Sequence, residues 1–424
     1  MSSGTITTGA HIVIVGGSLA GVRAAATLRE LGFGGHLSVV EQSPHAPYDR
    51  PPLSKGLLTG AQSEADIRLG DLTDLDVTWQ GGRAACGLDT DSRALHLDDG
   101  GRLDFDGLII ATGVSPRRFS AASTQQSPLL LRSLDHARAL RHALAERTGQ
   151  LLVVGAGFVG TEVAASARSL GWEVTLVAHE SVPLRRALGD DLGRYVSSLH
   201  RRHGVRLRLD TAITDLHVAA DHSGQATLDD GSRIDADVVV AGIGSVPNTA
   251  WLDDSDLWID DGVHTQSCLR VLNTSGRPVH GIAAAGDVAR WPHPLFGPVP
   301  VRVEHWSNAA EQGRAAARTV LADLAGPTSG IEATAHASVP SFWSDQYDTK
   351  ILSVGLPQLA DTARIVEGDP ADDAFVVAYG RDGLLVGAAG VGSSRSLARY
   401  RRAIARGEDF PDHQTAAAAT ARTA

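Results

Sequence analysis

The chain has 424 residues, of which 43% are apolar and 21% charged, as expected for a folded protein of two or three domains. Its formal net charge of −11 argues against nucleic acid as the main partner. Two cysteines, Cys86 and Cys268, are too few for a disulfide framework, and no apolar run approaches the roughly 20 residues that span a bilayer. Because the N-terminal residues also lack the pattern of a secretory signal, we expect a cytoplasmic protein.

Residues 11–42 are expected to form a strand, a glycine turn, a helix near 20–31 and a second strand. The turn, GGSLAG at 16–21, departs from G-x-G-x-x-G in having Ser18 at the middle glycine. The N-terminus of such a helix offers N–H groups and partial positive charge to a pyrophosphate, and glycines let the backbone approach it. Glu41 ends the second strand, where a carboxylate can accept hydrogen bonds from ribose hydroxyls.

A proline-rich loop, PHAPYDRPPLSKG, occupies 44–56, and short strands over 76–113 end in LIIATG. Residues 150–180 then repeat the first pattern, with GAGFVG at 155–160 forming a complete G-x-G-x-x-G between strand and helix. The repeat predicts two dinucleotide-binding units, and therefore two bound dinucleotides.

The second unit is followed by a helix expected at 190–203 and by strands that lead to VVVAGIG (238–244), the counterpart of LIIATG. GIAAAGDVARWP (281–292) is a further apolar strand that ends in Gly286-Asp287, and a helix is expected at 308–324. Residues 338–398 change to strand signals typical of a smaller α+β domain.

These elements predict an α/β fold with two Rossmann-like dinucleotide-binding domains and a smaller α+β C-terminal domain. The expected boundaries are 1–114 with 247–326 for a discontinuous FAD-binding domain, 115–246 for an NAD(P)-binding domain, 327–406 for the C-terminal domain and 407–424 for a disordered tail. A chain that holds a flavin and a nicotinamide nucleotide can convert a two-electron hydride into single electrons.

The sequence resembles the FAD-dependent pyridine nucleotide-disulfide oxidoreductases, in their ferredoxin reductase branch. The resemblance runs from about residue 11 to 358, and RPPLSK and EHWSNA are more specific signals than either glycine turn. The other motifs that carry it are GGSLAG, IIATG, LRSLDHA, GAGFVGTEVA, AGIGSVPN, AAGDVA and VPSFWSDQYDTKILSVGL.

The resemblance implies the residues that contact each nucleotide. For FAD they are Gly16, Ser18, Leu19, Ala20, Gly21, Glu41 or Gln42, Arg50, Lys55, Ala85, Ala111, Thr112, Gly113, Arg132, Gly286, Asp287, His305 and Trp306. For the nicotinamide nucleotide they are Gly155, Gly157, Phe158, Val159, Gly160, Glu162, His179, Glu180, Arg185, Gly242, Ile243 and Gly244.

Three of these residues are candidate catalytic residues. Lys55 follows two prolines that fix the chain, so its ammonium could be held where negative charge develops on a flavin. Glu162 lies one turn into the second helix, where it could pair with Lys55 across the domain interface and orient the nicotinamide carboxamide. Trp306 could shield the flavin ring. On the residues alone, a surface lysine, a helix-terminal carboxylate and a core tryptophan are the competing interpretations.

The choice between NADH and NADPH stays open. Ala178 ends the strand EVTLVA, at the position where the family usually places a glutamate that binds the ribose diol. The absence of this carboxylate removes repulsion against a 2′-phosphate. His179, Arg185 and Arg186 are candidates to meet that phosphate, whereas Glu180 could serve the diol. NADH is the family default, whereas the local chemistry favours NADPH.

The expected function is NAD(P)H:ferredoxin oxidoreductase, with an acidic [2Fe-2S] ferredoxin as partner that serves a cytochrome P450 or a Rieske oxygenase. Arg290, Arg302 and Arg314 are candidates for an arginine patch that docks it. A rubredoxin reductase, an NADH oxidase or a redox-sensing flavoprotein of the same fold are alternatives. A disulfide or peroxide reductase is disfavoured, because residues 42–60 contain no cysteine. His293, His305 and the pair His200 and His203 lack the spacing of a metal-binding set, so no metal is expected.

Overall fold

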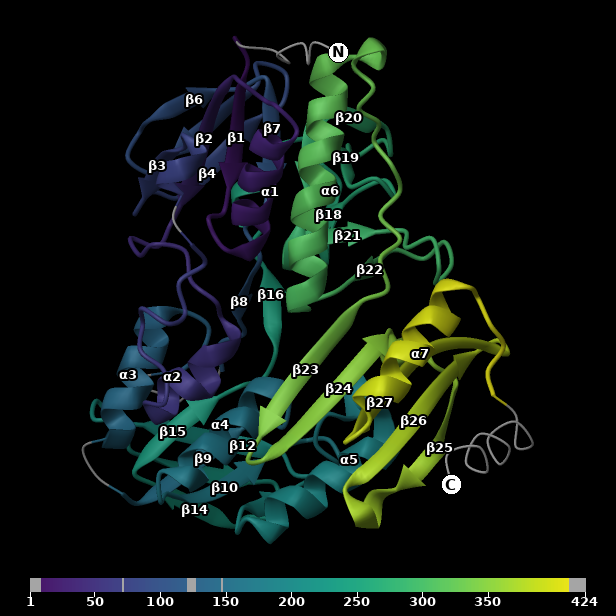
Figure 1. Cartoon of the computed structure of the whole chain (residues 1–424). Coiled ribbons are helices and arrows are strands. Elements are labelled where there is room, and N and C mark those ends of the chain that lie inside the picture. Colours follow the sequence, from purple (N-terminus) through teal and green to yellow (C-terminus); the bar gives the residue numbers. More distant parts are fainter. Residues whose placement is uncertain (1–8, 71, 120–126, 146–147, 412–424) are drawn as a thin grey trace. The chain divides into compact units, whose positions relative to one another are not determined.

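The computed structural model describes residues 9–70, 72–119, 127–145 and 148–411 (Figure 1). The chain forms two compact units. Unit 1 comprises Met1–Asp49, Arg68–Ser115 and Val246–Pro340, and unit 2 comprises Arg50–Ile67, Pro116–Ser245 and Ser341–Ala424. The chain leaves unit 1 within β8 (Val114–Pro116) and returns to it within β16 (Ser245–Pro247).

Unit 1 is built on a six-stranded sheet in which all strands but one edge strand run parallel. Residues 12–15 of one inner strand are all apolar, and Ile12, Val13 and Ile14 are fully buried, as expected for a parallel strand covered on both faces. In order, the strands are β19 (Arg270–Leu272), β20 (Pro278–Ala284), β7 (Gly107–Ile110), β1 (His11–Val15), β2 (His36–Glu41) and β3 (Thr78–Gly81).

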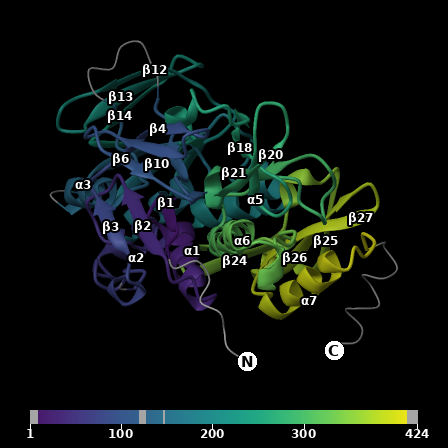
Figure 2. The ribbon, with the colours of Figure 1, turned by 90° about the horizontal axis from the view of Figure 1, so that it is seen from above.

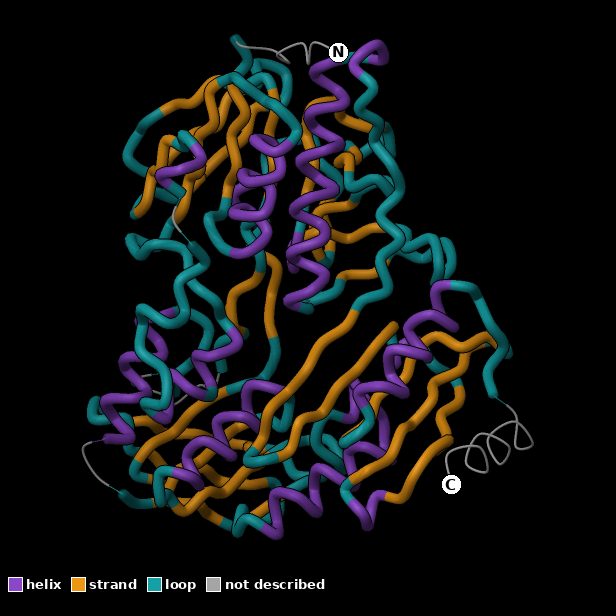
Figure 3. The backbone as a smooth tube through the Cα atoms, in the orientation of Figure 1, coloured by secondary structure: helices purple, strands orange, loops and turns teal. Residues whose placement is uncertain are grey.

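Two helices, α1 (Leu19–Glu30) and α6 (Trp306–Ala325), pack against each other beside this sheet (Figures 1 and 3). Two smaller sheets complete unit 1. One is antiparallel, with β4 (Ala85–Asp89), β5 (Ala94–Leu97) and β6 (Arg102–Asp104), and the other is mixed, with β17 (Ile259–Asp260), β18 (Gly262–His264), β21 (Ala289–Trp291) and β22 (Val301–Arg302).

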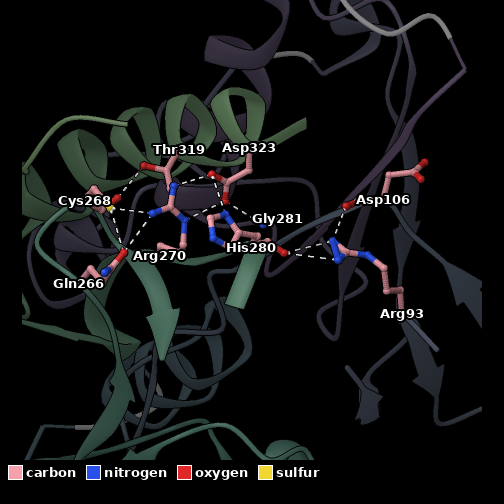
Figure 4. Close-up of polar contacts among 9 residues, drawn as sticks. All are labelled: Arg93, Asp106, Gln266, Cys268, Arg270, His280, Gly281, Thr319 and Asp323. Atoms are coloured by element: carbon pink, nitrogen blue, oxygen red, sulfur yellow. Dashed lines mark hydrogen bonds and ion pairs between the residues drawn. The ribbon is translucent and has the colours of Figure 1, made fainter. Parts of the chain in front are cut away.

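A largely buried ion pair joins α6 to the sheet (Figure 4). Arg270 of β19 donates to both carboxylate oxygens of Asp323, and the amide of Gly281 also donates to Asp323 at 2.8 Å. Thr319, one turn earlier, donates to the carbonyl of Cys268 at 2.6 Å. Because every buried polar group here has a partner, this cluster is explained as a structural anchor for α6.

Unit 2 contains a four-stranded parallel sheet in the order β11 (Arg206–Arg208), β10 (Glu173–Val177), β9 (Gln150–Val154) and β15 (Val238–Ala241). An antiparallel sheet of β12 (Ile213–Val218), β13 (Gly224–Leu228) and β14 (Arg233–Ala236) packs its buried face on a shared apolar core. The helices are α2 (Gly56–Thr59), α3 (Leu134–Ala145), α4 (Phe158–Ser169) and α5 (Arg185–Arg202).

The C-terminal part of unit 2 is a five-stranded antiparallel sheet with α7 (Ser394–Ala405) lying against it (Figure 2). Its order is β23 (Ser341–Gln346), β24 (Thr349–Gly355), β27 (Leu384–Val391), β26 (Ala374–Arg381) and β25 (Thr362–Asp369). The strand β23 contacts α4, the helix that follows the second glycine turn (Figure 1). The C-terminal sheet therefore packs against the first helix after the second glycine turn.

The structure confirms the α/β class with two Rossmann-like sheets and a smaller α+β part. The exact domain boundaries stay a prediction, although contacts group residues 50–67 with unit 2 and not with unit 1. The helix expected at 190–203 begins earlier, at Arg185, and is interrupted at Gly189, whose φ of +70° is not helical. Residues 412–424 of the expected tail lie outside the described residues. No described helix is both long and apolar enough to span a bilayer.

Candidate functional site

The first glycine turn lies between β1 and α1 in unit 1. Gly16 has a φ of +110°, and a Cβ there would lie 2.2 Å from the carbonyl oxygen of Ala111. A Cβ on Gly21 would lie 1.9 Å from the carbonyl oxygen of Gly16. Real Cβ atoms do not approach that closely, so the turn requires glycine at both positions. Ser18 precedes the helix in an extended conformation, and Leu19, Ala20 and Gly21 form its buried first turn.

Glu41 places its carboxylate at this turn. The amide of Gly17 donates to Oε2 at 2.6 Å and the amide of Ser43 donates to Oε1 at 2.9 Å. Gln42, the alternative position considered from the sequence, is exposed. Glu41 is therefore the better placed of the two residues for a ribose.

The segment Ala111-Thr112-Gly113 follows β7 and is fixed by Asn248. The side-chain amide of Asn248 donates to the carbonyl of Thr112 at 2.8 Å, and its backbone amide donates to the carbonyl of Gly113 at 3.0 Å. In return, the Thr112 hydroxyl donates to the carbonyl of Asn248 at 2.9 Å. Asn248 is the asparagine of the motif AGIGSVPN, and its role was not anticipated.

Gly286 and Asp287 follow β20, as expected, in a short 3-10 helix. The amide of Gly286 donates to the side chain of Gln312 at 2.8 Å, and a Cβ on Gly286 would come within 3.2 Å of Ala20. The Gly-Asp turn is thus packed against the start of α1. Ala85 lies at the start of β4, half-buried against the core of unit 1.

His305 and Trp306 begin α6. The Trp306 indole donates to Asp49 at 2.8 Å and so fixes the end of the loop that precedes residue 50. Burial lowers the pKa of His305 to about 4 against an opposing effect of Asp287, so the imidazole is neutral at pH 7. Asp49 was not among the predicted residues.

The second glycine turn lies between β9 and α4 in unit 2 and has the same geometry as the first. A Cβ on Gly155, whose φ is +100°, would lie 2.4 Å from the carbonyl oxygen of Gly242. A Cβ on Gly160 would lie 2.1 Å from the carbonyl oxygen of Gly155. Gly242 thus lies against this turn. Gly157, Val159 and Gly244 are exposed. Ile243 packs against the apolar core of unit 2. Phe158 makes an edge-to-face contact with Phe342 at 4.8 Å.

The end of β10 carries the residues considered for donor choice. Ala178 is buried and hydrogen-bonded through its backbone on both sides. Glu180 pairs with Arg186 at 2.8 Å and Arg185 pairs with Asp190 at 2.8 Å, while His179 is exposed. Both arginines considered for a 2′-phosphate are therefore already paired with carboxylates.

Lys55 and Glu162 form an ion pair, with the ammonium 2.7 Å from Oε2 of the carboxylate. The pairing predicted from the sequence is therefore present, but both residues belong to unit 2. The same oxygen accepts a hydrogen bond from the Ser54 hydroxyl at 2.5 Å, and Oε1 accepts one from the Ser344 hydroxyl at 2.6 Å. Glu162 is 6% exposed, so its charge is stabilised by these three donors in place of water.

Ser54 and Ser344 were missed in the sequence, because a serine in a loop or strand carries no signal of its own. Arg50, whose guanidinium donates to the carbonyl of Arg132 at 3.1 Å, lies with that residue in unit 2.

The three arginines considered for docking a ferredoxin are each paired with carboxylates. Arg290 pairs with Asp260, Arg302 with Asp261 and Glu304, and Arg314 with Glu311. They do not by themselves make a patch of net positive charge.

The histidines considered as metal ligands have other contacts. His200 bonds to Gln346 and Tyr347, His203 stacks on Tyr347, and His293 contacts the carbonyl of Ser338. Across the described part of the chain, no three His, Cys, Asp or Glu side chains are grouped to hold a metal ion.

Comparison with known proteins identifies two family models in the chain. Residues 10–313 match the model described as pyridine nucleotide-disulphide oxidoreductase, and residues 341–422 match the one described as reductase C-terminal. Rhodocoxin reductase of Rhodococcus erythropolis is 34% identical over 93% of this chain and 89% of that protein. The ferredoxin–NAD(+) reductase component of the p-cumate 2,3-dioxygenase system of Pseudomonas putida is 35% identical over 92% of both.

Among solved structures, this chain is similar to one chain in the crystal structure of the covalent putidaredoxin reductase–putidaredoxin complex. Its matching chain is 29% identical, with a TM-score of 0.83 over 95% of this chain and 94% of that one. The chain therefore belongs to the pyridine nucleotide-disulphide oxidoreductase family, in its ferredoxin reductase branch, and is an oxidoreductase that uses a flavin and NAD(P)H.

Proposed function

We propose that this protein is an NAD(P)H:ferredoxin reductase that binds FAD in unit 1 and the nicotinamide nucleotide in unit 2. The observation that carries the proposal is the pair of glycine turns, one at the start of α1 and one at the start of α4. In each turn a Cβ on the last glycine would lie within about 2.1 Å of a backbone carbonyl oxygen. Each turn therefore presents bare backbone at a helix N-terminus, which suits a pyrophosphate.

FAD fits the residues of unit 1. The turn at 16–21 would hold the pyrophosphate, Glu41 the adenosine ribose and Asp287 the ribityl hydroxyls. The segment 111–113, braced by Asn248, and the first residues of α6 would enclose the ring system, with Trp306 shielding it. The expected contacts Ala85 and His305 of unit 1 are part of the same proposal, and so are Arg50 and Arg132, which belong to unit 2.

The nicotinamide nucleotide fits unit 2. Its pyrophosphate would lie at the turn 155–160, and the turn 242–244 beside it would border the nucleotide. Ala178, His179, Glu180 and Arg185 would surround the adenosine ribose. Because Arg185 and Arg186 are already paired with carboxylates at the surface, a 2′-phosphate would have to compete with Asp190 or Glu180 for them. We therefore propose NADH as the preferred donor.

When bound, the flavin supplies the chemistry that accepts two electrons as hydride and releases them singly. The ammonium of Lys55 would stabilise the negative charge that develops on the flavin. Glu162 would hold the Lys55 ammonium in one position through its 2.7 Å ion pair and would bind the nicotinamide carboxamide.

A small [2Fe-2S] ferredoxin is the proposed electron acceptor, and it would serve a cytochrome P450 or a Rieske oxygenase. The relatives support this class of acceptor. We further propose that the ferredoxin is acidic and that both proteins work in the cytoplasm, where the free thiols of Cys86 and Cys268 would stay reduced.

Anaerobic rapid mixing tests the donor side of the proposal. The purified protein should carry FAD, and NADH should bleach its absorbance in a rapid first-order step. NADPH should react with up to about fivefold lower kcat/KM, because its phosphate must compete with a carboxylate for an exposed arginine, and such surface pairs contribute about 1 kcal/mol or less. A colourless protein that cannot be loaded with FAD would refute the proposal, and equal use of both donors would refute the NADH preference.

The acceptor is tested separately with the NADH-reduced protein. Rapid electron transfer to a [2Fe-2S] ferredoxin supports the proposed function. Preferential reduction of a rubredoxin, or of oxygen alone, would instead assign the chain to the rubredoxin reductases or NADH oxidases.

A further inference from the structure

A chain of buried polar side chains continues from Glu162 into the C-terminal sheet. The Ser344 hydroxyl donates to Oε1 of Glu162 at 2.6 Å and lies 3.2 Å from Nε2 of Gln346. Oε1 of Gln346 lies 2.9 Å from Nε2 of His200, and Nδ1 of His200 lies 3.0 Å from the Tyr347 hydroxyl. Ser344, Gln346 and His200 are each fully buried.

Every hydrogen bond of this chain has one possible direction. Because the Ser344 hydroxyl gives its proton to a carboxylate, it must accept from the Gln346 amide nitrogen. The same nitrogen donates to Thr161 at 3.0 Å, whose hydroxyl donates to backbone carbonyls. Oε1 of Gln346 therefore faces His200, which must carry its proton on Nε2 and accept from Tyr347 through Nδ1. All the donors point towards the carboxylate of Glu162.

This row of hydrogen bonds is better suited to orienting the Glu162 carboxylate than to conducting a proton. A primary amide stands in its middle, and an amide does not pass a proton on as a hydroxyl or an imidazole does. Burial lowers the pKa of His200 to about 4, so its ring is neutral at pH 7, as the hydrogen-bond directions require. These hydrogen bonds can supply a fixed donor, the Ser344 hydroxyl, to Oε1 of Glu162. Each hydrogen bond in the row polarises the next one and so strengthens it.

The hairpin that carries the chain is held under backbone strain. Gln346 and Thr349 pair across the turn between β23 and β24, and Tyr347 within it has a φ of +58°. Bulky side chains rarely adopt this left-handed region, because their Cβ crowds the backbone there. The ring of Tyr347 is nevertheless held there, stacked on His203 with centroids 3.7 Å apart and hydrogen-bonded to His200.

We propose that Ser344, Gln346, His200 and Tyr347 are positioning residues that fix the Glu162 carboxylate, and through it the Lys55 ammonium, for hydride transfer. The C-terminal sheet would thereby complete the nicotinamide site, by an ordered polar chain that begins at Ser344. This inference rests on the proposed function, because it assumes that Glu162 and Lys55 act on the nicotinamide and the flavin.

Ser344→Ala tests the proposal against a matched control, Ser353→Ala. Ser353 lies on the adjacent strand β24, is 1% exposed, and its hydroxyl has no hydrogen-bond partner among the described residues. Loss of the donor to a buried carboxylate should slow the anaerobic reduction of the flavin by NADH about tenfold in Ser344→Ala. Ser353→Ala should stay within about twofold of the natural chain.

A readout that does not depend on turnover accompanies these rates. Crystal structures of the two variants should show the Glu162 carboxylate turned or split between conformers in Ser344→Ala and unchanged in Ser353→Ala. Ser344→Thr, which keeps the hydroxyl, should restore both the rate and the single conformer.

Gln346→Glu adds a pH profile that a merely structural role would not produce. The titratable groups that face position 346 are Glu162, His200 and, beyond them, Lys55, Tyr347 and His203. When the introduced carboxyl group is protonated it can still donate to Ser344, whereas its ionised form draws the Ser344 proton away from Glu162. The hydride-transfer rate of this variant should therefore fall as the pH rises, relative to the natural chain at each pH.

Glu162→Gln separates the two levels of the argument. If it changes neither the hydride-transfer rate nor the calorimetric affinity for NAD⁺, the role proposed for Glu162 itself fails. If Glu162→Gln slows hydride transfer but Ser344→Ala behaves like Ser353→Ala, and Gln346→Glu follows the pH profile of the natural chain, the positioning chain is refuted and the proposed function stands.

Discussion

At the scale of single residues, the buried partners of His200 determine the protonation state of its ring, which the sequence leaves open. His200 and His203 stand three positions apart, and the sequence offers no partner for either of them. The partners lie far along the chain, with Gln346 146 positions and Tyr347 147 positions from His200. Contacts of such separation follow from the packing of α5 on the C-terminal sheet, which no local pattern encodes.

The tautomer of His200 is a direct prediction. In the full-length protein labelled with ¹⁵N-histidine, the His200 ring should be neutral and protonated at Nε2 throughout pH 5.5–8, because burial holds its pKa near 4. Two-dimensional NMR of the ring nitrogens distinguishes the tautomers. A ring that titrates near 6.5, or one protonated at Nδ1, would contradict the assigned hydrogen-bond directions. His200→Gln identifies the signal.

The pair of Lys55 and Glu162 was predictable from the sequence through two specific motifs, RPPLSK and GAGFVGTEVA. Its surroundings were not. Ser54 and Ser344 are 108 and 182 positions from Glu162, and serine is too common a residue to mark a site. The sequence also placed the pair across two domains, whereas the loop that carries Lys55 packs within unit 2.

At the scale of elements, the two glycine turns were the most predictable feature, because a backbone that must pass within van der Waals contact of another backbone allows no side chain. The start of α5 was the least predictable. Arg185 and Arg186 form a first helical segment that Gly189 interrupts, and a glycine of positive φ inside a polar stretch is easily taken for the residue before a helix.

Gly160→Ala tests the turn in unit 2. Its Cβ would meet the carbonyl oxygen of Gly155 at 2.1 Å, so α4 must shift away from the turn. We expect the affinity for NAD⁺ to fall at least about tenfold while the FAD content stays that of the natural chain, because the clash is confined to unit 2. Calorimetry and the visible spectrum measure the two quantities. Unchanged affinity for NAD⁺ would exclude this turn as its binding site.

At the scale of the whole molecule, buried neutral histidines make stability depend on pH. Burial lowers the pKa of His200 in unit 2 and of His336 in unit 1 to about 4, and the charge of His293 contributes to the shift at His336. Their pKa in the unfolded chain is about 6.5, so between pH 6.5 and 4 the unfolded state binds more protons than the folded state. Stability should therefore fall as the pH drops through this window.

From pH 7 to pH 5 each of these histidines should cost the protein about 2 kcal/mol in free energy of unfolding. Thermal and urea unfolding of the natural chain and of His336→Gln measure the effect. The variant should lose less stability than the natural chain over this interval. Equal losses would show that His336 does not remain neutral in the folded protein.

The most direct test of the whole account is the yield of electrons per nicotinamide. Under anaerobic conditions, a limiting amount of NADH is added to the flavin-loaded protein and an excess of oxidised [2Fe-2S] ferredoxin, and the reduced ferredoxin is counted by its absorbance. We predict about two molecules of reduced ferredoxin per NADH, because a hydride delivers two electrons that leave one at a time. If NADH bleaches the flavin but the ferredoxin stays oxidised, a [2Fe-2S] ferredoxin is not the electron acceptor of this protein.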